Sequence, residues 1–301
     1  MSDTWTIQAA LEWTQGYLGR KGDANPRLSA QWLLSEATGL SRVELYAHFD
    51  RPLSMDEREA LRGLVTRRGA GEPLQYITGE VGFRHITLKV QPGVLIPRPE
   101  TEVLVSEALA TLTPAKELQP VLVADICTGS GCIACSIAHE YPSARILATD
   151  IAPQAVALAA ANADRLGLSD RVTVIECDLG AAVPAELMGS FDLVVSNPPY
   201  VPHAILGELP SEVSEFEPLL ALDGGHDGLE VFRKMLPWVA QALAPGGAAV
   251  FELHETCLED AARIAQEVGF CSTKIVRDLA DRQRVLVATS NGHTDGKVTH
   301  A

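Results

Sequence analysis

The residues Asn197-Pro198-Pro199-Tyr200 place a primary amide, two prolines and a phenol directly after the apolar run 191–195. Neither proline can donate a backbone hydrogen bond and each holds φ near about −65°, so a strand over the apolar run must end here. The Asn197 amide oxygen and the Pro198 carbonyl can each accept one N–H, and Tyr200 can stack on a planar group. We therefore expect Asn197, Pro198 and Tyr200 to be catalytic, by holding a substrate –NH2 group while its nitrogen is alkylated, with Pro199 completing the substrate-binding loop.

The tetrapeptide alone is also typical of a tight Asn-Pro turn that closes a strand and does no chemistry. Features upstream favour the functional interpretation. Gly129 and Gly131 lie between a predicted strand, 121–125, and a predicted helix, where backbone N–H groups can approach a ligand closely. Asp150 ends the next predicted strand and could take both hydroxyls of a ribose, and Asp178, after the third, could meet an adenine amino group.

Residues 129–134 also fit the dinucleotide pattern G-x-G-x-x-A, with Asp150 as the acidic residue further on. A dehydrogenase is thus an alternative for this half of the chain. Against it, Asp125 would place a negative charge beside a pyrophosphate, whereas it suits a cationic ligand. The loop at Asn197 also has no role in hydride transfer.

From residue 120 onward, apolar runs alternate with helical patterns, which predicts an α/β fold with a doubly wound, seven-stranded sheet. The predicted strands are 121–125, 144–149, 172–175, 191–195, 248–251, 273–276 and 284–288, the last two forming an antiparallel close. The predicted domains are a small N-terminal helical bundle (1–70), a linker with a β-hairpin (71–99), the α/β domain (100–290) and a loose tail (291–301). The bundle carries no catalytic constellation, so it is either a substrate-docking module or a packing appendage.

The net charge is −15, and it is unevenly distributed over the 301 residues. Residues 1–75 are nearly neutral at −1, whereas residues 76–301 carry −14. A strongly acidic domain is a poor match for a phosphate backbone, so a protein substrate is expected rather than duplex DNA. The composition, 47% hydrophobic and 21% charged, is typical of a cytoplasmic globular protein. We expect no secretory signal and no membrane span.

Two of the six cysteines, Cys132 and Cys135, form a CxxC, which is compatible with redox chemistry or half a metal site. No second CxxC follows and no histidine has a ligand-like spacing. The pair falls in the predicted helix behind the glycine loop, so small buried thiols and no metal site are expected.

The segment Leu95-Ile96-Pro97-Arg98-Pro99-Glu100-Thr101-Glu102 leads into a predicted helix. Alone, such a proline-rich stretch is more often a linker and helix cap than a binding site. Its charged side chains nevertheless make Arg98 and Glu100 candidates for substrate binding.

Taken together, these motifs resemble the class I S-adenosylmethionine-dependent methyltransferases that act on amide or amino nitrogens. Within that class the chain resembles the peptide chain release factor N5-glutamine methyltransferases. The segments that carry the resemblance are 45–53, 72–79, 95–102, 125–131, 191–202, 222–229, 278–280 and 284–288, together with Asp150. The resemblance implies a Rossmann-like methyltransferase sheet, and methylation of the glutamine in the Gly-Gly-Gln loop of release factors.

By that resemblance, Asn197 and Pro198 hold the glutamine amide and Tyr200 packs on it. The residues expected to bind S-adenosylmethionine are Asp125, Cys127, Thr128, Gly129, Ser130, Gly131, Asp150, Asp178, Leu179 and Asn197. Cys127 stands where the family often has a glycine, so we expect a negative φ there, with the sulfur near the methionine end of the cofactor. Residues 252–254 are Glu-Leu-His where Glu-Ile-Gly is common, and we expect them to lie away from the chemistry.

We therefore expect direct in-line transfer of a methyl group from the sulfonium to the amide nitrogen, without a covalent enzyme intermediate. No general base with a raised or lowered pKa is evident near the loop, so positioning and oxygen acceptors should carry the catalysis. One alternative is a nucleic-acid methyltransferase acting on adenine N6 or guanine N2 of a flipped base, which should carry a basic groove. The other is a non-catalytic binding module, which would tolerate loss of the loop or of the cofactor carboxylates.

Overall fold

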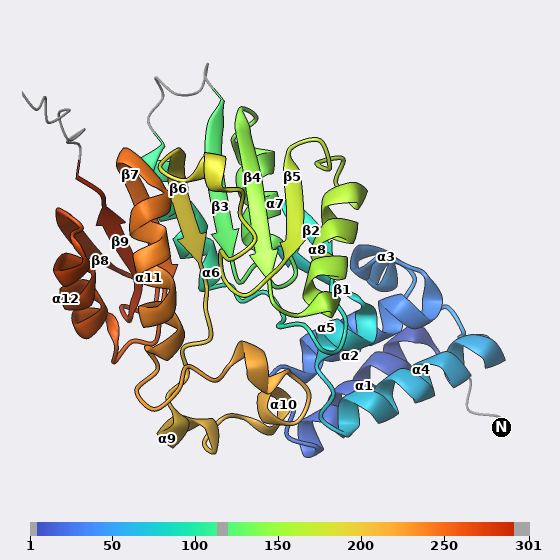
Figure 1. The fold of residues 1–301 in the computed structure, drawn as a ribbon. Coiled ribbons are helices and arrows are strands. Elements are labelled where there is room, and N and C mark those ends of the chain that lie inside the picture. Colours follow the sequence, from blue (N-terminus) through green and yellow to red (C-terminus); the bar gives the residue numbers. More distant parts are fainter. Residues whose placement is uncertain (1–4, 113–119, 292–301) are drawn as a thin grey trace, which may run out of the picture. The chain divides into compact units, whose positions relative to one another are not determined.

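The computed structural model describes residues 5–112 and 120–291, and the chain divides into two compact units (Figure 1). The predicted tail, apart from Asn291, lies outside the described residues. Unit 1 comprises Met1–Glu80 with Pro210–Phe216, and unit 2 comprises Val81–Leu209 with Glu217–Ala301.

Unit 1 is helical, as the apolar periodicity of its sequence predicts. Its helices are α1 (Ile7–Arg20), α2 (Pro26–Thr38), α3 (Arg42–Ala47), α4 (Met55–Gly69), α5 (Leu74–Thr78) and α10 (Ser211–Ser214). Pro26 opens α2, and Gly39 ends it in the left-handed conformation. Arg68 pairs with Asp23 at 2.7 Å and with Glu212 at 3.1 Å, so an ion pair ties Pro210–Phe216 to this unit.

Unit 2 is built on a seven-stranded sheet in the order β5-β4-β3-β6-β7-β9-β8. The strands are β3 (Val121–Ile126), β4 (Ala144–Asp150), β5 (Val172–Glu176), β6 (Phe191–Ser196), β7 (Leu243–Glu252), β8 (Ser272–Arg277) and β9 (Gln283–Thr289). The first five run parallel, and β9 lies antiparallel between β7 and β8. The predicted doubly wound sheet and its antiparallel close are thus confirmed, with β7 longer than its predicted apolar part, 248–251. A separate two-stranded sheet pairs β1 (Glu80–Phe83) with β2 (Ile86–Lys89).

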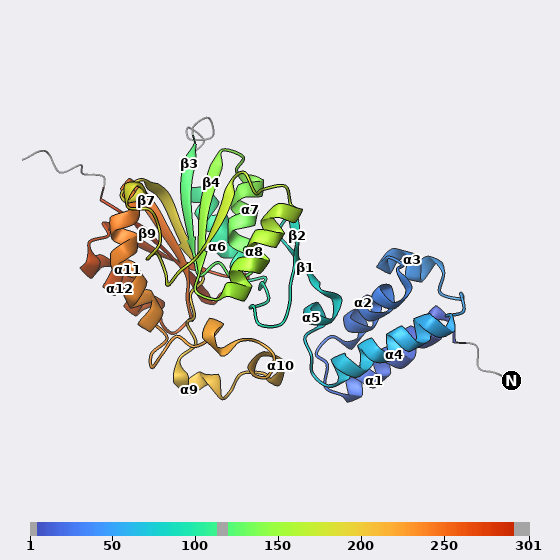
Figure 2. The same ribbon diagram turned by 45° about the vertical axis from the view of Figure 1, so that its right-hand side comes forward.

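Helices cover both faces of the large sheet (Figure 2). They are α6 (Thr101–Thr111), α7 (Cys132–Glu140) and α8 (Pro153–Arg165) on one face, with α11 (Glu230–Ala242) and α12 (Leu258–Val268) on the other. Short helical turns complete the unit at α9 (His203–Leu206), η2 (Ala185–Leu187) and η3 (Leu219–Ala221). No helix among the described residues is both long and apolar enough to cross a bilayer.

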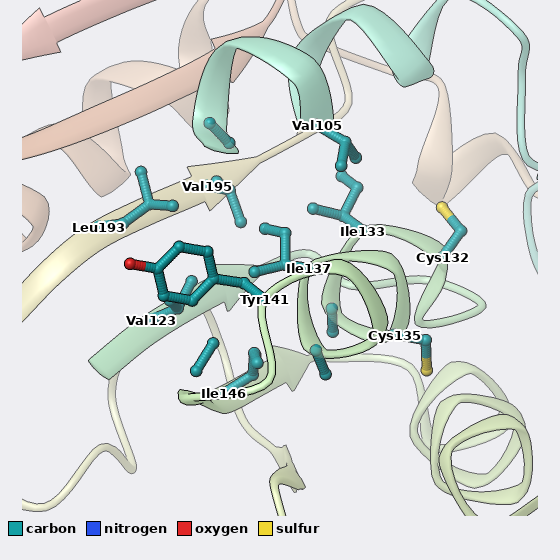
Figure 3. Packing of buried hydrophobic residues seen from close by; sticks show 14 of the residues in the cluster. Val105, Val123, Cys132, Ile133, Cys135, Ile137, Tyr141, Ile146, Leu193 and Val195 are labelled. Carbon is teal, nitrogen blue, oxygen red and sulfur yellow. The ribbon is translucent and has the colours of Figure 1, made fainter. Parts of the chain in front are cut away.

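The two cores follow from the alternation of side chains along the strands. On β6, Leu193 and Val195 enter the core beside α6 and α7, whereas Val194 enters the core beside α11 and α12. Figure 3 shows the first core, where Ile133 and Ile137 of α7 lie among residues of α6, β3 and β6. Strands buried on both faces read as continuous apolar runs, which is why the sequence located them.

Candidate active site

The order of the strands places a switch point between β3 and β6, whose helical connections leave in opposite directions along the sheet. Ligands of open α/β sheets bind beyond the carboxyl ends of the strands at such a point. A cavity of about 320 Å³ lies there, and this size is sufficient for a small ligand. Its walls include Cys127 and Gly129 after β3, Asp150 at the end of β4, and Asn197 after β6.

Asn197 occupies the cavity wall with its amide oriented by α6. Its Nδ2 donates a hydrogen bond to Oγ1 of Thr101, the first residue of that helix, at 3.3 Å. This leaves the amide oxygen Oδ1 available to accept a hydrogen bond from a ligand. The predicted loop residue Pro199 also lines the cavity, and Pro198 is buried beside it.

Tyr200 is held by a group that sequence reasoning missed. Its hydroxyl donates a hydrogen bond to Oε1 of Glu252, at the end of β7, over 3.0 Å. Burial and the nearby Glu252 raise the pKa of the phenol, so it remains protonated and acts as a donor. Burial also raises the pKa of the Glu252 carboxyl. Because its carboxylate contacts Tyr200, the expectation that residue 252 lies away from the chemistry is wrong.

Two backbone hydrogen bonds fix the chain after Tyr200. The N–H of Val201 donates to the Leu222 carbonyl at 2.8 Å, and the N–H of Gly224 donates to the Val201 carbonyl at 2.9 Å. A β-carbon on Gly224 would lie 2.6 Å from the backbone of Tyr200. The segment 222–229 therefore holds the loop through a contact that only glycine allows.

The glycine loop adopts a backbone that the sequence did not predict. Cys127 has a φ of +61°, so the expected negative φ is wrong. The reason lies in its neighbour: the Thr128 N–H donates to the Thr149 carbonyl on β4 and its hydroxyl donates to Asp125. These bonds turn the chain back across the strand end and outweigh a strain on the order of 1–2 kcal/mol.

Gly131 closes the loop against α8. Its φ is +79°, and a β-carbon there would lie 3.2 Å from the backbone of Ala159. The helix α7 begins immediately after it, at Cys132.

Asp125 lies beneath the loop, not on the cavity wall. Its Oδ2 accepts hydrogen bonds from the Thr128 hydroxyl at 2.6 Å and from the Ala134 N–H at 3.1 Å. Its Oδ1 is buried without a hydrogen-bond partner among the described residues. Burial raises the pKa of this carboxyl to about 7, with a smaller contribution from Asp150. A cationic ligand group nearby would favour the ionised form.

Asp150 is fixed in the wall by backbone donors. Its Oδ2 accepts from the Gly129 N–H at 2.8 Å and its Oδ1 accepts from the Ala152 N–H at 2.9 Å. Each oxygen keeps a second lone pair, so the carboxylate can still accept from two ligand hydroxyls. Burial raises the pKa of Asp150, and these hydrogen bonds oppose that effect.

Some of the remaining predicted residues line the cavity, and the others lie outside its wall. Asp178 and Leu179 line the cavity. Arg98 does not line it: its guanidinium pairs with buried Glu217, whose other oxygen accepts from the Ile96 N–H at 3.3 Å. Thr128, Ser130 and Gly131 form the loop behind the wall, and Glu100 is exposed at the start of α6.

The cavity also has wall residues that were not predicted from the sequence. They are Gly93, Val94, Leu95, Ile151, Ala152, Ala155, Pro218, Leu220, Ala221, Asp223, Val231 and Lys234. Leu95 and Asp223 fall in the conspicuous segments 95–102 and 222–229, which could have identified them. The stretch 218–221 is apolar with no motif, and it reaches the cavity only through the fold. Among the described residues, no group of three or more metal-ligating side chains could hold a metal ion. Cys132 and Cys135 are free and buried, as expected.

Comparison with known families matches both parts of the chain. Residues 9–79 match the family described as "PrmC N-terminal domain", and residues 101–207 match the "Methyltransferase small domain". The protein of Geobacter sulfurreducens named "Release factor glutamine methyltransferase" is 45% identical over 94% of this chain and 96% of its own. The protein of the same name from Moorella thermoacetica is 41% identical over 94% of this chain and 98% of its own.

Among solved structures, the hMettl16 catalytic domain in complex with MAT2A 3′UTR hairpin 6 has a TM-score of 0.53. The similarity covers 70% of this chain and 77% of that one, at 15% sequence identity. A similarity at this level of identity supports the methyltransferase fold of the sheet domain alone.

Proposed function

We propose, from the premise that this chain belongs to the release factor glutamine methyltransferase family, that it methylates the glutamine side chain in the Gly-Gly-Gln loop of peptide chain release factors. The product is N5-methylglutamine. The observation that carries this proposal is the Asn197 amide, held by Thr101 on the wall of a cavity that also presents Asp150 and Asp178.

The cavity fits S-adenosylmethionine as methyl donor. Asp150 supplies two carboxylate oxygens with free lone pairs for the ribose hydroxyls, and Asp178 supplies an acceptor for the adenine amino group. The orphaned Oδ1 of Asp125 and the raised pKa of its carboxyl suit a nearby cation. When bound, the cofactor supplies a methyl group on a sulfonium, whose C–S bond breaks as the new C–N bond forms.

The loop 197–200 does the work of positioning the acceptor. The Oδ1 of Asn197 and the carbonyl of Pro198 accept the two N–H bonds of the glutamine amide, while Tyr200 packs beside it. These acceptors stabilise the positive charge that grows on the nitrogen during attack. After transfer the nitrogen would lose its extra proton to water, and the demethylated cofactor, a neutral thioether, would be released.

The partner that this reaction implies is a release factor, recognised as a folded protein by its exposed glutamine loop. Residues 76–301, which contain the cavity, carry a net charge of −14, and a protein surface is better suited to that charge than a nucleic acid. A protein that modifies release factors would act in the cytoplasm, where translation terminates.

Mass spectrometry of a release factor incubated with this protein and isotope-labelled S-adenosylmethionine tests the proposal. We expect one labelled methyl group on the glutamine of the Gly-Gly-Gln loop. A release factor with glutamate at that position is the matched control and should remain unlabelled. Absence of label on the glutamine, or label only at other residues, would contradict the proposal.

Asp150→Ala is expected to weaken S-adenosylmethionine binding by about 1–3 kcal/mol, because it removes a charged acceptor for two hydroxyls. This corresponds to about 5- to 150-fold in Kd, measurable by calorimetry. Asp170→Ala, at an exposed aspartate away from the cavity, is the control and should leave Kd unchanged. Unchanged affinity in Asp150→Ala would exclude a ribose-binding role for this residue.

We also expect no direct, salt-sensitive binding to duplex DNA, because release of counterions needs clustered Lys and Arg side chains. Fluorescence anisotropy with a labelled duplex at rising salt concentrations measures this. Micromolar affinity that falls steeply with salt would contradict the expectation and favour a nucleic-acid substrate.

A further inference from the structure

One buried carboxylate, Glu252, lies beside both ends of the loop 197–200. It is the last residue of β7, which pairs with β6 in parallel, so its side chain lies next to the end of the strand that carries the loop. Its exposed fraction is 1%, and it is not part of the cavity wall. Glu252 therefore reaches the loop through neighbouring side chains.

One hydrogen bond connects this carboxylate to the loop, a second hydroxyl lies close by, and the other carboxylate oxygen, Oε2, is buried without a hydrogen-bond partner among the described residues. The Tyr200 hydroxyl donates to Oε1 at 3.0 Å and fixes the end of the loop. The Thr101 hydroxyl lies beside the same carboxyl group and, like Tyr200, lowers its pKa. Thr101 accepts the Nδ2 hydrogen of Asn197, so its own hydrogen is free to point at Glu252.

We propose that Glu252 is a positioning residue for methyl transfer, which as a carboxylate accepts hydrogen bonds from Tyr200 and Thr101 and thereby fixes the ring of Tyr200 and the amide of Asn197. The inference rests on the proposed function. A carboxylate is acceptor-only, so it forces both hydroxyls to donate toward it. Thr101 must then receive the Asn197 Nδ2 hydrogen, and this selects the amide orientation with Oδ1 available to the substrate.

The groups around Glu252 shift its pKa in both directions. Burial is the largest influence and raises its pKa, and Glu100 on α6 adds to this, whereas Arg284 on β9 favours the ionised form. Its negative charge also acts on Cys132 at the start of α7. The fraction of ionised Glu252 therefore falls as the pH is lowered through a pKa above its ordinary value of about 4.3. Under the proposal, kcat falls over the same pH range.

Loss of the Glu252 charge should affect stability and activity differently: kcat should fall, whereas the melting temperature should not. Because the pKa of Glu252 is higher in the folded protein than in the unfolded chain, the group stabilises the fold below its unfolded pKa, and this stabilisation is lost as the pH rises through the folded pKa. At neutral pH, Glu252→Gln removes a buried charge and should not lower the melting temperature. If Glu252 only stabilised the fold, Glu252→Gln would instead lower the melting temperature.

The test compares kcat, KM for a release factor, Kd for S-adenosylmethionine and melting temperature in the wild type, Glu252→Gln, Tyr200→Phe and the double variant. We expect each single variant to lower kcat about 10-fold, since a displacement near 1 Å can cost about 10²-fold. The Kd should stay within about 2-fold, because the predicted cofactor contacts lie elsewhere in the cavity. The double variant should lose no more than Glu252→Gln alone, because Tyr200→Phe removes a contact that Glu252→Gln has already disturbed.

The pH profile of kcat provides the second readout. The acidic decline of the wild type should disappear in Glu252→Gln and persist in Asp192→Asn, a carboxylate-to-amide control at the opposite end of β6. Wild-type kcat in Glu252→Gln, additive losses in the double variant, or a melting temperature that falls in step with kcat would each overturn the inference. Tyr200→Phe keeps the ring and provides the kcat comparison if Glu252→Gln does not fold. A wild type that leaves release factors unmethylated would instead refute the proposed function.

Discussion

Replacement of Asn197 by alanine is expected to lower kcat on a release factor by about 10²–10³-fold, the cost of removing one preorganised polar contact at a reacting centre. The side chain lines the cavity, and its Nδ2 is held by Thr101, so its oxygen is fixed before substrate arrives. Alanine leaves a substrate N–H without its protein acceptor. Affinity for S-adenosylmethionine should change by less than about 3-fold, because Gly129 and Asp150 remain in place.

Single-turnover kinetics with a release factor and calorimetry with the cofactor together test this expectation. Asn197→Asp keeps the size and an acceptor oxygen but adds a negative charge and removes the donor to Thr101, so it should also be slow. Asn291→Ala, at an exposed asparagine in a different part of the domain, is the matched control and should have wild-type kcat. Near-native turnover in Asn197→Ala would mean that the loop is structural.

The strands of the sheet domain could be predicted from the sequence because each depends mainly on the residues of its own segment. Each parallel strand is buried on both faces and reads as an apolar run, as in the residues 121–125 and 191–195. Gly129, Asp150 and Asn197 follow three such strands, and parallel strands end at one edge, so their convergence on one cavity follows from the topology. The association of 210–216 with the helical unit was not readable, because it depends on an ion pair between Arg68 and Glu212, which lie far apart in the sequence.

The missed features of the site depend on contacts between distant segments. Thr101 and Glu252 are separated by 151 positions and acquire a role only because α6 and β7 meet beside the loop. The residue types Glu-Leu-His at 252–254 do not indicate that the Glu252 carboxylate will accept a hydrogen bond from Tyr200. The positive φ of Cys127 was missed for a similar reason, because residue type favours a negative φ and the hydrogen bond from Thr128 to Thr149 overrides that preference.

Gly224→Ala is expected to destabilise the protein and to lower kcat together, although residue 224 is not part of the cavity wall. Its β-carbon would lie 2.6 Å from the Cα and carbonyl carbon of Tyr200 and 2.8 Å from the Cα of Gly228. Both neighbours are backbone, so neither can move aside as a flexible side chain would. The free energy of unfolding should fall by about 1–3 kcal/mol, as in other overpacked sites.

The loss of activity follows from which backbone is displaced. The N–H of Gly224 donates to the Val201 carbonyl at 2.9 Å. A β-carbon that displaces Tyr200 therefore also distorts this hydrogen bond, which holds the end of the loop. A shift of about 1 Å in the loop should lower kcat by about 10²-fold. Urea unfolding and steady-state kinetics measure the two effects on the same samples. Gly207→Ala is the matched control, because its β-carbon would meet nothing within 4 Å and its φ of −75° suits alanine. That variant should keep wild-type kcat and stability within about 0.5 kcal/mol. If Gly224→Ala behaved like Gly207→Ala, the segment 222–229 would not be what holds the catalytic loop in place.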